Sequence, residues 1–491
     1  MEKTSQRTIL FLIADTGAGH RSAANAIRNA IILISQKEQE EWHARQQQFT
    51  ESSTHAAEQP RTELSLAPPT YRIEIVDVFE EYSRFPLREA VKLYGPTIRY
   101  NPKMYGRFFH LSNEERSVTA AQTVASPLIL NGLMRLITNV QPDVIVSVHP
   151  LLNHITIKAL QKLHMHIPFL TVVTDLVSLH YSWFAPGADA YIVPTEQAKA
   201  LFLSRGFDPN RVHMLGMPID PKFTRPTESK EELQRKFGLV PGLPVVLLVG
   251  GGDGAGGLYD AARSISRARL PVQLLIITGR NRRLYAHLQR TRTSFHVPVK
   301  VFGFVQNMPE MMRASDVIIT KAGPGTINEA LACDLPIILS GYVPGQEEGN
   351  VDFVLKNDVG ILAYDSIELV DGLRRLIKPG SATMRRQLEN AKRLSRPNAS
   401  FAIANCILSF LPPAGQPGLQ QTIRLRNRRP IMSRTLRSSE ARLRALRRRL
   451  PRMSRISFLK SPVVSRLSRM RASGFPRRFI QLTARDQDQT R

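Results

Sequence analysis

Short apolar runs alternate with amphipathic stretches over almost the whole of residues 7–410. The first group of runs predicts strands at Thr8–Ile13, Arg72–Val76, Val144–Val148, Phe169–Val173, Tyr191–Val193 and Val212–Leu215. The second group predicts strands at Val245–Val249, Val272–Ile277, Lys300–Phe302, Val317–Thr320 and Pro336–Leu339. Strands that alternate with helices are typical of parallel sheets with helical crossover connections. The pattern therefore predicts an α/β protein with two doubly wound, Rossmann-like domains that face a cleft.

The boundaries of these domains follow from changes in composition. The segment Gly216–Glu232 is rich in proline and polar residues, which indicates a linker. Lys37–Pro69 contains few aliphatic residues and predicts a flexible insertion between the first helix and the second strand. We expect an acceptor domain over residues 1–218, a donor domain over 219–411 whose last helix packs back on the first domain, and a tail over 412–491.

Cysteine content and hydropathy limit the setting of the protein. Cys333 and Cys406 are the only cysteines, so the sequence has no disulfide framework, and a reducing compartment is expected. The N-terminus lacks the apolar region and cleavage site of a signal peptide. No segment has the roughly 18–20 consecutive apolar residues of a membrane-spanning helix. We expect a cytoplasmic protein that can lie on a membrane without crossing it.

The net charge of +26 is concentrated in the tail, because residues 421–491 contain 21 basic and three acidic residues. Leu436, Leu443, Leu446 and Leu450 recur at helical spacing among arginines, which favours basic amphipathic helices that lie on anionic lipid. A solvated, disordered tail is the alternative. Nucleic acid would also attract this charge, but aromatic residues are sparse and no nucleic-acid-binding fold is evident.

A glycine-rich turn, Ala14–Ser22, follows the first strand and opens the first helix. Gly17 and Gly19 allow an acceptor substrate to approach the backbone. His20, at the start of the helix, is placed to act as a general base on an acceptor hydroxyl. A glycine turn with a capping histidine is an equally good interpretation.

The segment Lys321–Asn350 carries the densest set of candidate ligands. Gly323, Gly325 and Thr326 open a helix whose unpaired N–H groups suit a phosphate. Glu329, one turn further on, can accept hydrogen bonds from ribose hydroxyls. After the next strand, an amide and carboxylate cluster can bind a sugar: Gln346, Glu347 and Asn350. This arrangement predicts a nucleotide-sugar site at the carboxyl ends of parallel strands.

Two further strand ends supply candidate groups. Six glycines occupy residues 250–257, and Gly251, Gly252 and Gly254 favour a phosphate cradle over a merely flexible connection. This loop lacks the lysine of an ATP-hydrolysing phosphate loop. Phe304 can pack on a pyrimidine while neighbouring backbone groups read its edge, although a lone phenylalanine more often belongs to a core.

The strand that ends at Val173 leads to Asp175, which either orients His20, binds the acceptor or caps a helix. Trp183 and Phe184 either contact lipid chains or fill a core.

Together these motifs resemble the monogalactosyldiacylglycerol synthase and processive diacylglycerol glucosyltransferase family, which has the GT-B fold. The matching stretches are LFLIADTGAGHRSAANAI, VVTDLVSLHYSWF, YIVPTEQAKALFLSRGFDPNRVHMLGMPI, LLVGGGDGAGG and VFGFVQNMPEMMRASDVIITKAGPGTINEALACDLPIILSGYVPGQEEGN. They occur in family order and cover most of residues 7–405. Ala18 replaces a glycine that many relatives have, and the Lys37–Pro69 insertion and the tail lie outside the shared pattern.

The resemblance implies an inverting transfer of a hexose from UDP-glucose or UDP-galactose to diacylglycerol. It implies that His20 is the base, that Glu329 binds ribose, that Phe304 and Val305 read uracil, and that Gln346, Glu347 and Asn350 lie near the donor sugar and diphosphate. It also implies that no metal or other cofactor is needed, because helix dipoles and N–H groups stabilise the leaving diphosphate. The enzyme is then expected at the inner face of the cell membrane.

Three alternatives remain open from the residues. A UDP-sugar epimerase has the same two-domain architecture and needs neither lipid nor a basic tail. A polyprenyl-linked N-acetylglucosaminyl transferase has a related architecture. A non-catalytic binding protein would not require an intact His20 or the Gln346–Asn350 cluster.

Overall fold

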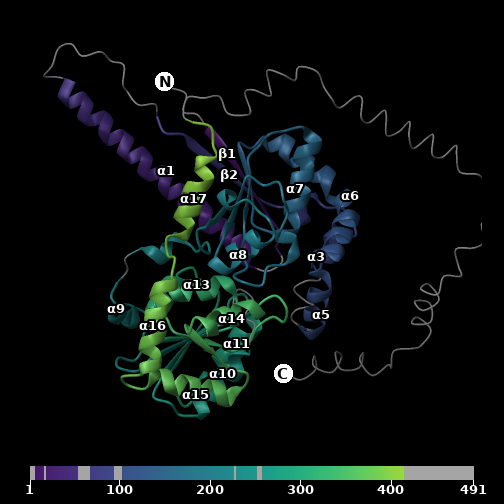
Figure 1. The fold of residues 1–491 in the computed structure, drawn as a ribbon. Coiled ribbons are helices and arrows are strands. Elements are labelled where there is room, and N and C mark those ends of the chain that lie inside the picture. The colour runs from purple at the N-terminus through teal and green to yellow at the C-terminus, as the bar shows by residue number, and fades with distance from the viewer. Residues whose placement is uncertain are drawn as a thin grey trace, which may run out of the picture. The chain divides into compact units, whose positions relative to one another are not determined.

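The computed structural model describes residues 6–15, 18–53, 67–92, 102–225, 228–250 and 257–413. Two six-stranded sheets organise these residues, with strand orders β2-β1-β3-β4-β5-β6 and β12-β11-β10-β7-β8-β9 (Figure 1). Every described strand pair is parallel. We call the first sheet with its covering helices the first lobe, and the second sheet with its helices the second lobe. The predicted GT-B class is confirmed.

The first lobe consists of strands whose residues are mostly buried on both faces, as continuous apolar runs in a parallel sheet require. Its strands are β1 (Gln6–Ile13), β2 (Thr70–Asp77), β3 (Val144–Ser147), β4 (Phe169–Val172), β5 (Ala190–Val193) and β6 (Val212–Met214). Its helices are α1 (Ala18–Ser53), α2 (Val78–Tyr82), α3 (Leu87–Lys92), α5 (Pro102–Ser112), α6 (Glu115–Val140), α7 (Pro150–Leu163) and α8 (Glu196–Ser204), with short 3₁₀ turns η1 (Tyr181–Trp183) and η2 (Pro209–Arg211).

The second lobe repeats this plan. Its strands are β7 (Val245–Val249), β8 (Gln273–Ile277), β9 (Val299–Phe302), β10 (Val317–Thr320), β11 (Ile337–Leu339) and β12 (Gly360–Leu362). Its helices are α9 (Lys230–Lys236), α10 (Leu258–Arg267), α11 (Arg282–Thr291), α12 (Met308–Arg313), α13 (Pro324–Ala332), α14 (Glu348–Lys356), α15 (Ser366–Ile377) and α16 (Ala382–Leu394), with 3₁₀ turns η3 (Pro221–Thr224) and η4 (Arg292–Ser294).

The last helix, α17 (Ala399–Ser409), belongs to the core of the first lobe although it follows the second lobe in sequence. Its Ile403, Ala404 and Ile407 are fully buried in one cluster with strand β1 and helix α1. Figure 1 shows α17 lying beside α1. Burial of these apolar side chains ties the two ends of the described chain together.

The connection from β6 to η3 is held by close packing. Gly216 has φ +101°, and a Cβ there would lie 2.9 Å from the Cβ of Arg396 and 3.0 Å from that of Ala399. Because neither space nor the backbone conformation suits a larger residue, glycine is required at this position. The Ser400 hydroxyl donates to the carbonyl of Ile219, which fixes the same segment to α17.

All eleven predicted strands are present, each within two residues of its predicted ends. Strand β12 was not predicted, because its three residues form too short an apolar run to stand out. The domain boundaries, at residues 218 and 411, stay predictions.

The predicted flexible insertion is wrong over its first part, because α1 continues through Lys37 to Ser53. Glutamine, glutamate, lysine and arginine all have good helix propensity, and Glu41 pairs with both Lys37 and Arg45 at i, i+4 spacing. Residues 54–66 and the tail beyond residue 413 lie outside the described residues. In the part of the chain that is described, no helix is both long and apolar enough to span a bilayer.

Candidate active site

His20 lies in the first turn of α1, next to the carboxyl ends of β3 and β4. Its Nδ1 is 2.7 Å from the carbonyl oxygen of Val148 and 3.1 Å from the hydroxyl of Thr174. A carbonyl can only accept, so Nδ1 carries the proton and Nε2 keeps its lone pair. The ring is thereby held in the tautomer that a general base requires.

Burial keeps this imidazole neutral. Desolvation lowers the pKa of His20 to about 4, although the Val148 carbonyl and the carboxylate of Asp15 both oppose the shift. The ring of His149 stands edge-on to that of His20, with 4.5 Å between the centroids. His149 is buried, its pKa lies well below the usual value for the same reason, and its Nδ1 accepts from the Leu151 N–H at the start of α7.

The loop before α1 is fixed by carboxylates. The backbone N–H of Asp15 donates to Asp77, which also caps α2 by accepting from the N–H of Glu80. Arg21 pairs with Asp15 at 2.7 Å. These bonds join Asp15 to α1 and to the start of α2. Gly17 lies outside the described residues. Gly19 borders open space, since a Cβ there would meet no atom within 4 Å.

Asp175 follows β4 and accepts a hydrogen bond of 2.6 Å from the indole N–H of Trp183. Burial, reinforced by the charge of Glu347, raises the pKa of Asp175 to about 6, although the Trp183 bond opposes the rise. The orientation of His20 comes from Val148 and Thr174 instead. A role of Asp175 with the acceptor stays a prediction.

Trp183 does not meet the expectation of a lipid contact. It is fully buried, and with Phe184 it belongs to the core of the first lobe. The structure therefore adopts the core-filling alternative. Burial of the indole N–H is tolerated because the carboxylate of Asp175, from the same lobe, accepts its hydrogen bond.

The second lobe presents the start of α13 at the end of β10. Gly323 is the N-cap residue, and no described side chain caps the helix, so its first N–H groups remain available to an anion. A Cβ on Gly325 would meet nothing within 4 Å. Thr326 and Glu329 are half-buried on the same helix. Burial and the nearby carboxylate of Asp220 raise the pKa of Glu329 to about 7.

Glu347 and Asn350 are more deeply buried than a direct ligand role suggests, with exposed fractions of 4% and 3%. Glu347 pairs with Lys321 and accepts from the backbone N–H of Val343 at 2.8 Å. The Asn350 amide donates to the carbonyl of Ala322 at 2.9 Å. Both side chains therefore join the loop after β11 to the loop after β10. Their predicted contacts with the donor are untested.

Phe304 lies just after β9 and is 60% exposed, so one ring face is accessible to a base. The guanidinium of Arg280, which follows β8, lies 5.5 Å from the ring centroid. Val305 is half-buried and packs against the core of the second lobe. The pair thus sits on a turn, as predicted, rather than inside the core.

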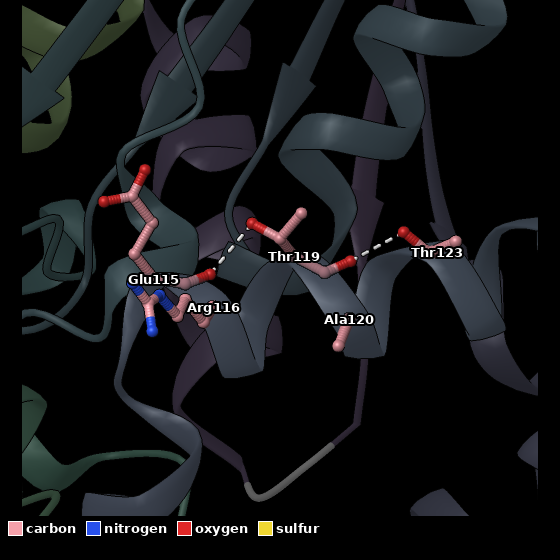
Figure 2. Close-up of a pocket in the computed structure, with 5 residues that line it drawn as sticks. All are labelled: Glu115, Arg116, Thr119, Ala120 and Thr123. Atoms are coloured by element: carbon pink, nitrogen blue, oxygen red, sulfur yellow. Dashed lines mark hydrogen bonds between the residues drawn. The ribbon is translucent and has the colours of Figure 1, made fainter.

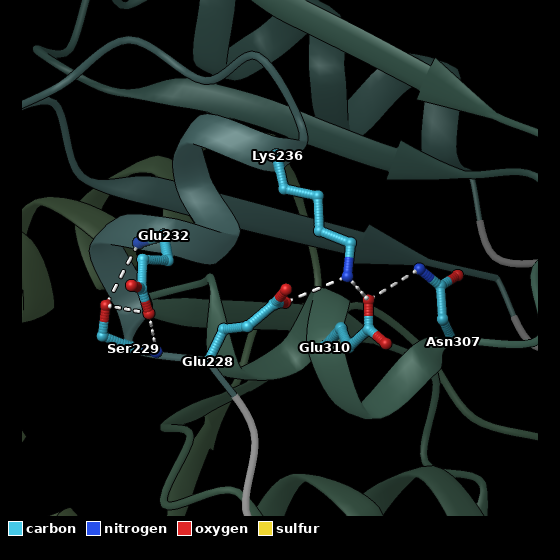
Figure 3. A network of polar contacts seen from close by, with 6 residues as sticks. All are labelled: Glu228, Ser229, Glu232, Lys236, Asn307 and Glu310. Atoms are coloured by element: carbon cyan, nitrogen blue, oxygen red, sulfur yellow. Dashed lines mark hydrogen bonds and ion pairs between the residues drawn. The ribbon is translucent and has the colours of Figure 1, made fainter.

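A polar network fixes the helix that follows this turn (Figure 3). The Asn307 amide and the Lys236 ammonium both donate to the carboxylate of Glu310, at 3.2 and 3.1 Å. Lys236 also pairs with Glu228, beside the capping box that starts α9. The start of α12 is therefore tied to α9, which limits the positions open to Phe304.

Residues 53–219 match the family model of monogalactosyldiacylglycerol synthase, and residues 245–403 match that of the glycosyltransferase family 28 C-terminal domain. The chain is 35% identical to the probable monogalactosyldiacylglycerol synthase 2, chloroplastic, of Oryza sativa subsp. japonica, over 82% of this chain and 80% of that protein. The chain belongs to the monogalactosyldiacylglycerol synthase family. It is therefore a glycosyltransferase, as predicted.

Other similarities agree with this assignment. The monogalactosyldiacylglycerol synthase 3, chloroplastic, of Arabidopsis thaliana is 34% identical over 82% of this chain and 81% of its own length. A putative UDP-N-acetylglucosamine 2-epimerase from Listeria monocytogenes aligns with a TM-score of 0.50 and 14% identity, over 82% of this chain and 96% of that structure. At that identity the likeness shows a shared fold and nothing about the reaction.

Several members of the predicted site lie where the structure gives no description. Gly251, Gly252 and Gly254 lie outside the described residues, so the phosphate cradle stays a prediction. In the described part of the chain, no group of three or more histidine, cysteine, aspartate or glutamate side chains is arranged to hold a metal ion.

Two surface hollows contain none of the predicted catalytic or donor-binding residues. One, of about 580 Å³, runs along α6 beside Glu115, Arg116, Thr119, Ala120 and Thr123 (Figure 2). The hydroxyls of its two threonines each donate to a backbone carbonyl one turn earlier, at 2.8 Å. The other, of about 540 Å³, contains Arg205 stacked on Phe184. The threonine hydroxyls of the first hollow are therefore already bonded to the helix.

Sequence reasoning missed several residues of this site. Lys321 follows β10 directly and His149 comes two residues after β3, so the rule that polar groups gather at strand ends would have found both. Arg280 follows β8 in the same way. Tyr105, on α5, gives no such signal, yet its hydroxyl donates to Gln346 at 3.0 Å.

Proposed function

We propose that this protein transfers galactose from UDP-galactose to the free hydroxyl of diacylglycerol, with inversion at the anomeric carbon. The observation that carries the proposal is the geometry of His20, whose Nδ1–H is directed at Val148 while Nε2 keeps its lone pair. Membership of the monogalactosyldiacylglycerol synthase family supports the choice of sugar and lipid.

In the proposed reaction, Nε2 of His20 removes the proton from the acceptor hydroxyl. The oxygen attacks the anomeric carbon of the donor, and the bond from that carbon to the diphosphate breaks on the opposite face. UDP leaves with the bonding electron pair, and His20 returns its proton to solvent. With a pKa of about 4 the imidazole is neutral at physiological pH, so the lone pair of Nε2 is not occupied by a proton.

The donor is proposed to bind in the second lobe. Phe304 packs on uracil, Glu329 accepts from the ribose hydroxyls, and the diphosphate lies at the start of α13. The uncapped N–H groups and the dipole of that helix stabilise the charge that develops on the leaving group. The proposal includes no metal or other cofactor, so transfer is expected to persist in the presence of a chelator.

The first lobe is proposed to face the bilayer. Four large apolar side chains of residues 85–124 are exposed by more than half: Phe85, Met104, Leu111 and Val124. Such a surface, together with the basic tail, suits a lipid substrate and an anionic membrane. We propose a peripheral location on the inner face of the cell membrane; the relatives named above are chloroplastic.

One assay separates the alternatives. Purified full-length protein is mixed with anionic liposomes that contain diacylglycerol, and with either radiolabelled UDP-galactose or UDP-glucose, in EDTA. We expect galactolipid from UDP-galactose and at least tenfold less glycolipid from UDP-glucose. Glucolipid as the main product would overturn the choice of sugar, and an epimerised sugar nucleotide without glycolipid would indicate the epimerase. Transfer only from radiolabelled UDP-N-acetylglucosamine to an added polyprenyl-linked acceptor would indicate the N-acetylglucosaminyl transferase alternative.

Vesicle sedimentation tests the membrane proposal on the same preparation. Removal of residues 421–491 is expected to weaken binding to anionic vesicles more than it lowers turnover on detergent-dispersed diacylglycerol. Equal sedimentation of the full and shortened chains would exclude a membrane role for the tail.

A further inference from the structure

Helix α5 of the first lobe packs against the loop of the second lobe that precedes α14. One face of α5 carries Tyr105, Gly106, Phe109 and His110, and each of them contacts residues 344–348. The spacing of one, three and four residues places these side chains on one side of a helix. The contact therefore uses a whole helical face rather than a single residue.

The two backbones approach closely at two glycines. A Cβ on Gly106 would lie 2.7 Å from the Cβ of Pro344, and a Cβ on Gly345 would lie 2.8 Å from the ring of Phe109. Gly345 also has φ +79°, a conformation that disfavours any other residue. A larger residue at either position would push helix and loop apart, so this packing defines the position of the loop.

Polar contacts fix the same loop at both ends. His110 Nε2 lies 3.6 Å from the carboxylate of Glu348, whose other oxygen accepts from the N–H of Gly345. Between Gly345 and Glu348 in the sequence, Gln346 accepts a hydrogen bond of 3.0 Å at Oε1 from the Tyr105 hydroxyl. Because the amide oxygen accepts this bond, the Nε2 hydrogens are turned away from Tyr105.

We propose that Tyr105 is a positioning residue for the donor sugar. It holds the Gln346 amide so that Nε2 donates to a hydroxyl of the hexose, and it does so from the lobe that binds the acceptor. The inference rests on the proposed function, since it takes Gln346 to be a contact of the donor sugar. A consequence is that the sugar site is complete only when α5 lies against the loop.

The opposite face of α5 strengthens the inference. Met104 and Leu111 are exposed there, together with Arg107, on the side that we propose faces lipid. One short helix thus carries a lipid-facing side and a side that orients a donor-binding amide. Binding of the sugar nucleotide is therefore coupled to the acceptor-side lobe through Tyr105.

The test compares two ligands that differ only in the sugar. Calorimetry gives the Kd of UDP and of UDP-galactose for the full-length protein and for Tyr105→Phe, which removes only the hydroxyl. We expect the Kd of UDP-galactose to rise about three- to tenfold, as the loss of one hydrogen bond implies, with the Kd of UDP changed less than twofold. Gln346→Ala should raise the Kd of UDP-galactose at least as much.

A matched control is available on α11, where Gln289 donates to the Tyr285 hydroxyl at 3.1 Å on the surface. Tyr285→Phe removes the same kind of tyrosine–glutamine bond and should change neither Kd. The double variant Tyr105→Phe/Gln346→Ala should bind UDP-galactose no more weakly than Gln346→Ala alone, because both changes act on the same contact between Gln346 and the sugar.

Three results would overturn the inference, and they can be told apart. If Gln346→Ala leaves the Kd of UDP-galactose unchanged, the donor role of Gln346 fails, and the positioning role of Tyr105 fails with it. If Gln346→Ala weakens UDP-galactose but Tyr105→Phe does not, Gln346 binds the sugar without help from Tyr105. Equal loss of UDP and UDP-galactose affinity in Tyr105→Phe would indicate a merely structural contact.

Discussion

The two lobes use their polar strand-end residues in different ways. In the first lobe, Nδ1 of His20 is hydrogen-bonded to the protein, and Nε2 keeps its lone pair. In the second lobe, Glu347 and Asn350 direct polar atoms to the protein itself, and both are almost fully buried. Residues that look equally functional in the sequence therefore divide into one that is set up to react and two that hold loops together.

This difference has a physical origin. A buried carboxylate is costly unless it is paired, so Glu347 is stable only while Lys321 and the Val343 N–H satisfy it. An imidazole avoids the same cost by staying neutral, as the lowered pKa of His20 shows. His20 can thus stay partly unsatisfied as a reactive group, whereas Glu347 cannot.

The largest expected effect belongs to His20→Ala. Loss of the general base should lower kcat by about 10³-fold, within the range for such groups. The Kd of UDP should change less than twofold, because UDP is proposed to bind the other lobe. Product formation on diacylglycerol liposomes and calorimetry with UDP measure the two quantities.

The same substitution elsewhere on α1 serves as the control. His43 is exposed on that helix, so His43→Ala should leave both quantities unchanged. A parallel loss of turnover and UDP affinity in His20→Ala would mean that His20 supports the fold of the site rather than the proton transfer, and the contrast between the lobes would disappear.

A smaller effect is expected from Glu347→Ala, and it should appear first in stability. Removal of this carboxylate leaves the half-buried ammonium of Lys321 without its partner, which should lower the free energy of unfolding by about 2–3 kcal/mol. Urea denaturation followed by fluorescence measures the change. Asp352→Asn breaks an exposed pair with Lys356 on the same helix and should cost less than about 0.5 kcal/mol.

The result for Glu347→Ala distinguishes a residue that binds the sugar from one that holds a loop in place. If Glu347→Ala keeps its stability and loses only affinity for UDP-galactose, Glu347 is a ligand of the sugar and the two lobes use their carboxyl-end residues alike. If stability falls as expected, loop support accounts for the burial of Glu347.

The sequence predicted the framework well because each strand of a parallel sheet is a continuous apolar run. β1 and β7 are unmistakable for this reason, while β12 has only Gly360–Leu362. Helix α1 was predicted too short, because the absence of aliphatic residues after Lys37 indicated flexibility. Helix propensity and i, i+4 ion pairs need no apolar face, and they extend the helix to Ser53.

The site was predictable only where one strand end supplies the whole signal. His20 and Glu329 follow their strands by seven and nine residues and lie on the helix that comes next, so their location could be inferred. The partner of Glu347 is Lys321, 26 residues earlier, and Gln346 is bonded by Tyr105, 241 residues away. Such pairings depend on how loops and lobes pack, which no local pattern records.

The smallest expected effect concerns Glu329, the second-lobe counterpart of His20 as a half-buried titrating group. Its pKa of about 7 means that the accepting carboxylate forms only as the pH rises through 7. Affinity for UDP should therefore increase up to about tenfold from pH 6 to pH 8. Glu329→Gln does not titrate at this position. It should bind UDP weakly, and its affinity should lack the rise with pH that Glu329 causes.

Stability should change in the opposite sense. Because the folded pKa of Glu329 is raised, its contribution to stability is fully present below pH 4.5 and is lost as the pH rises through 7. Glu329→Gln should then unfold at a higher temperature than the parent at pH 8, and at the same temperature at pH 4. Equal pH dependence of UDP binding in both proteins would show that Glu329 does not contact the ribose, and the second lobe would have no counterpart to His20.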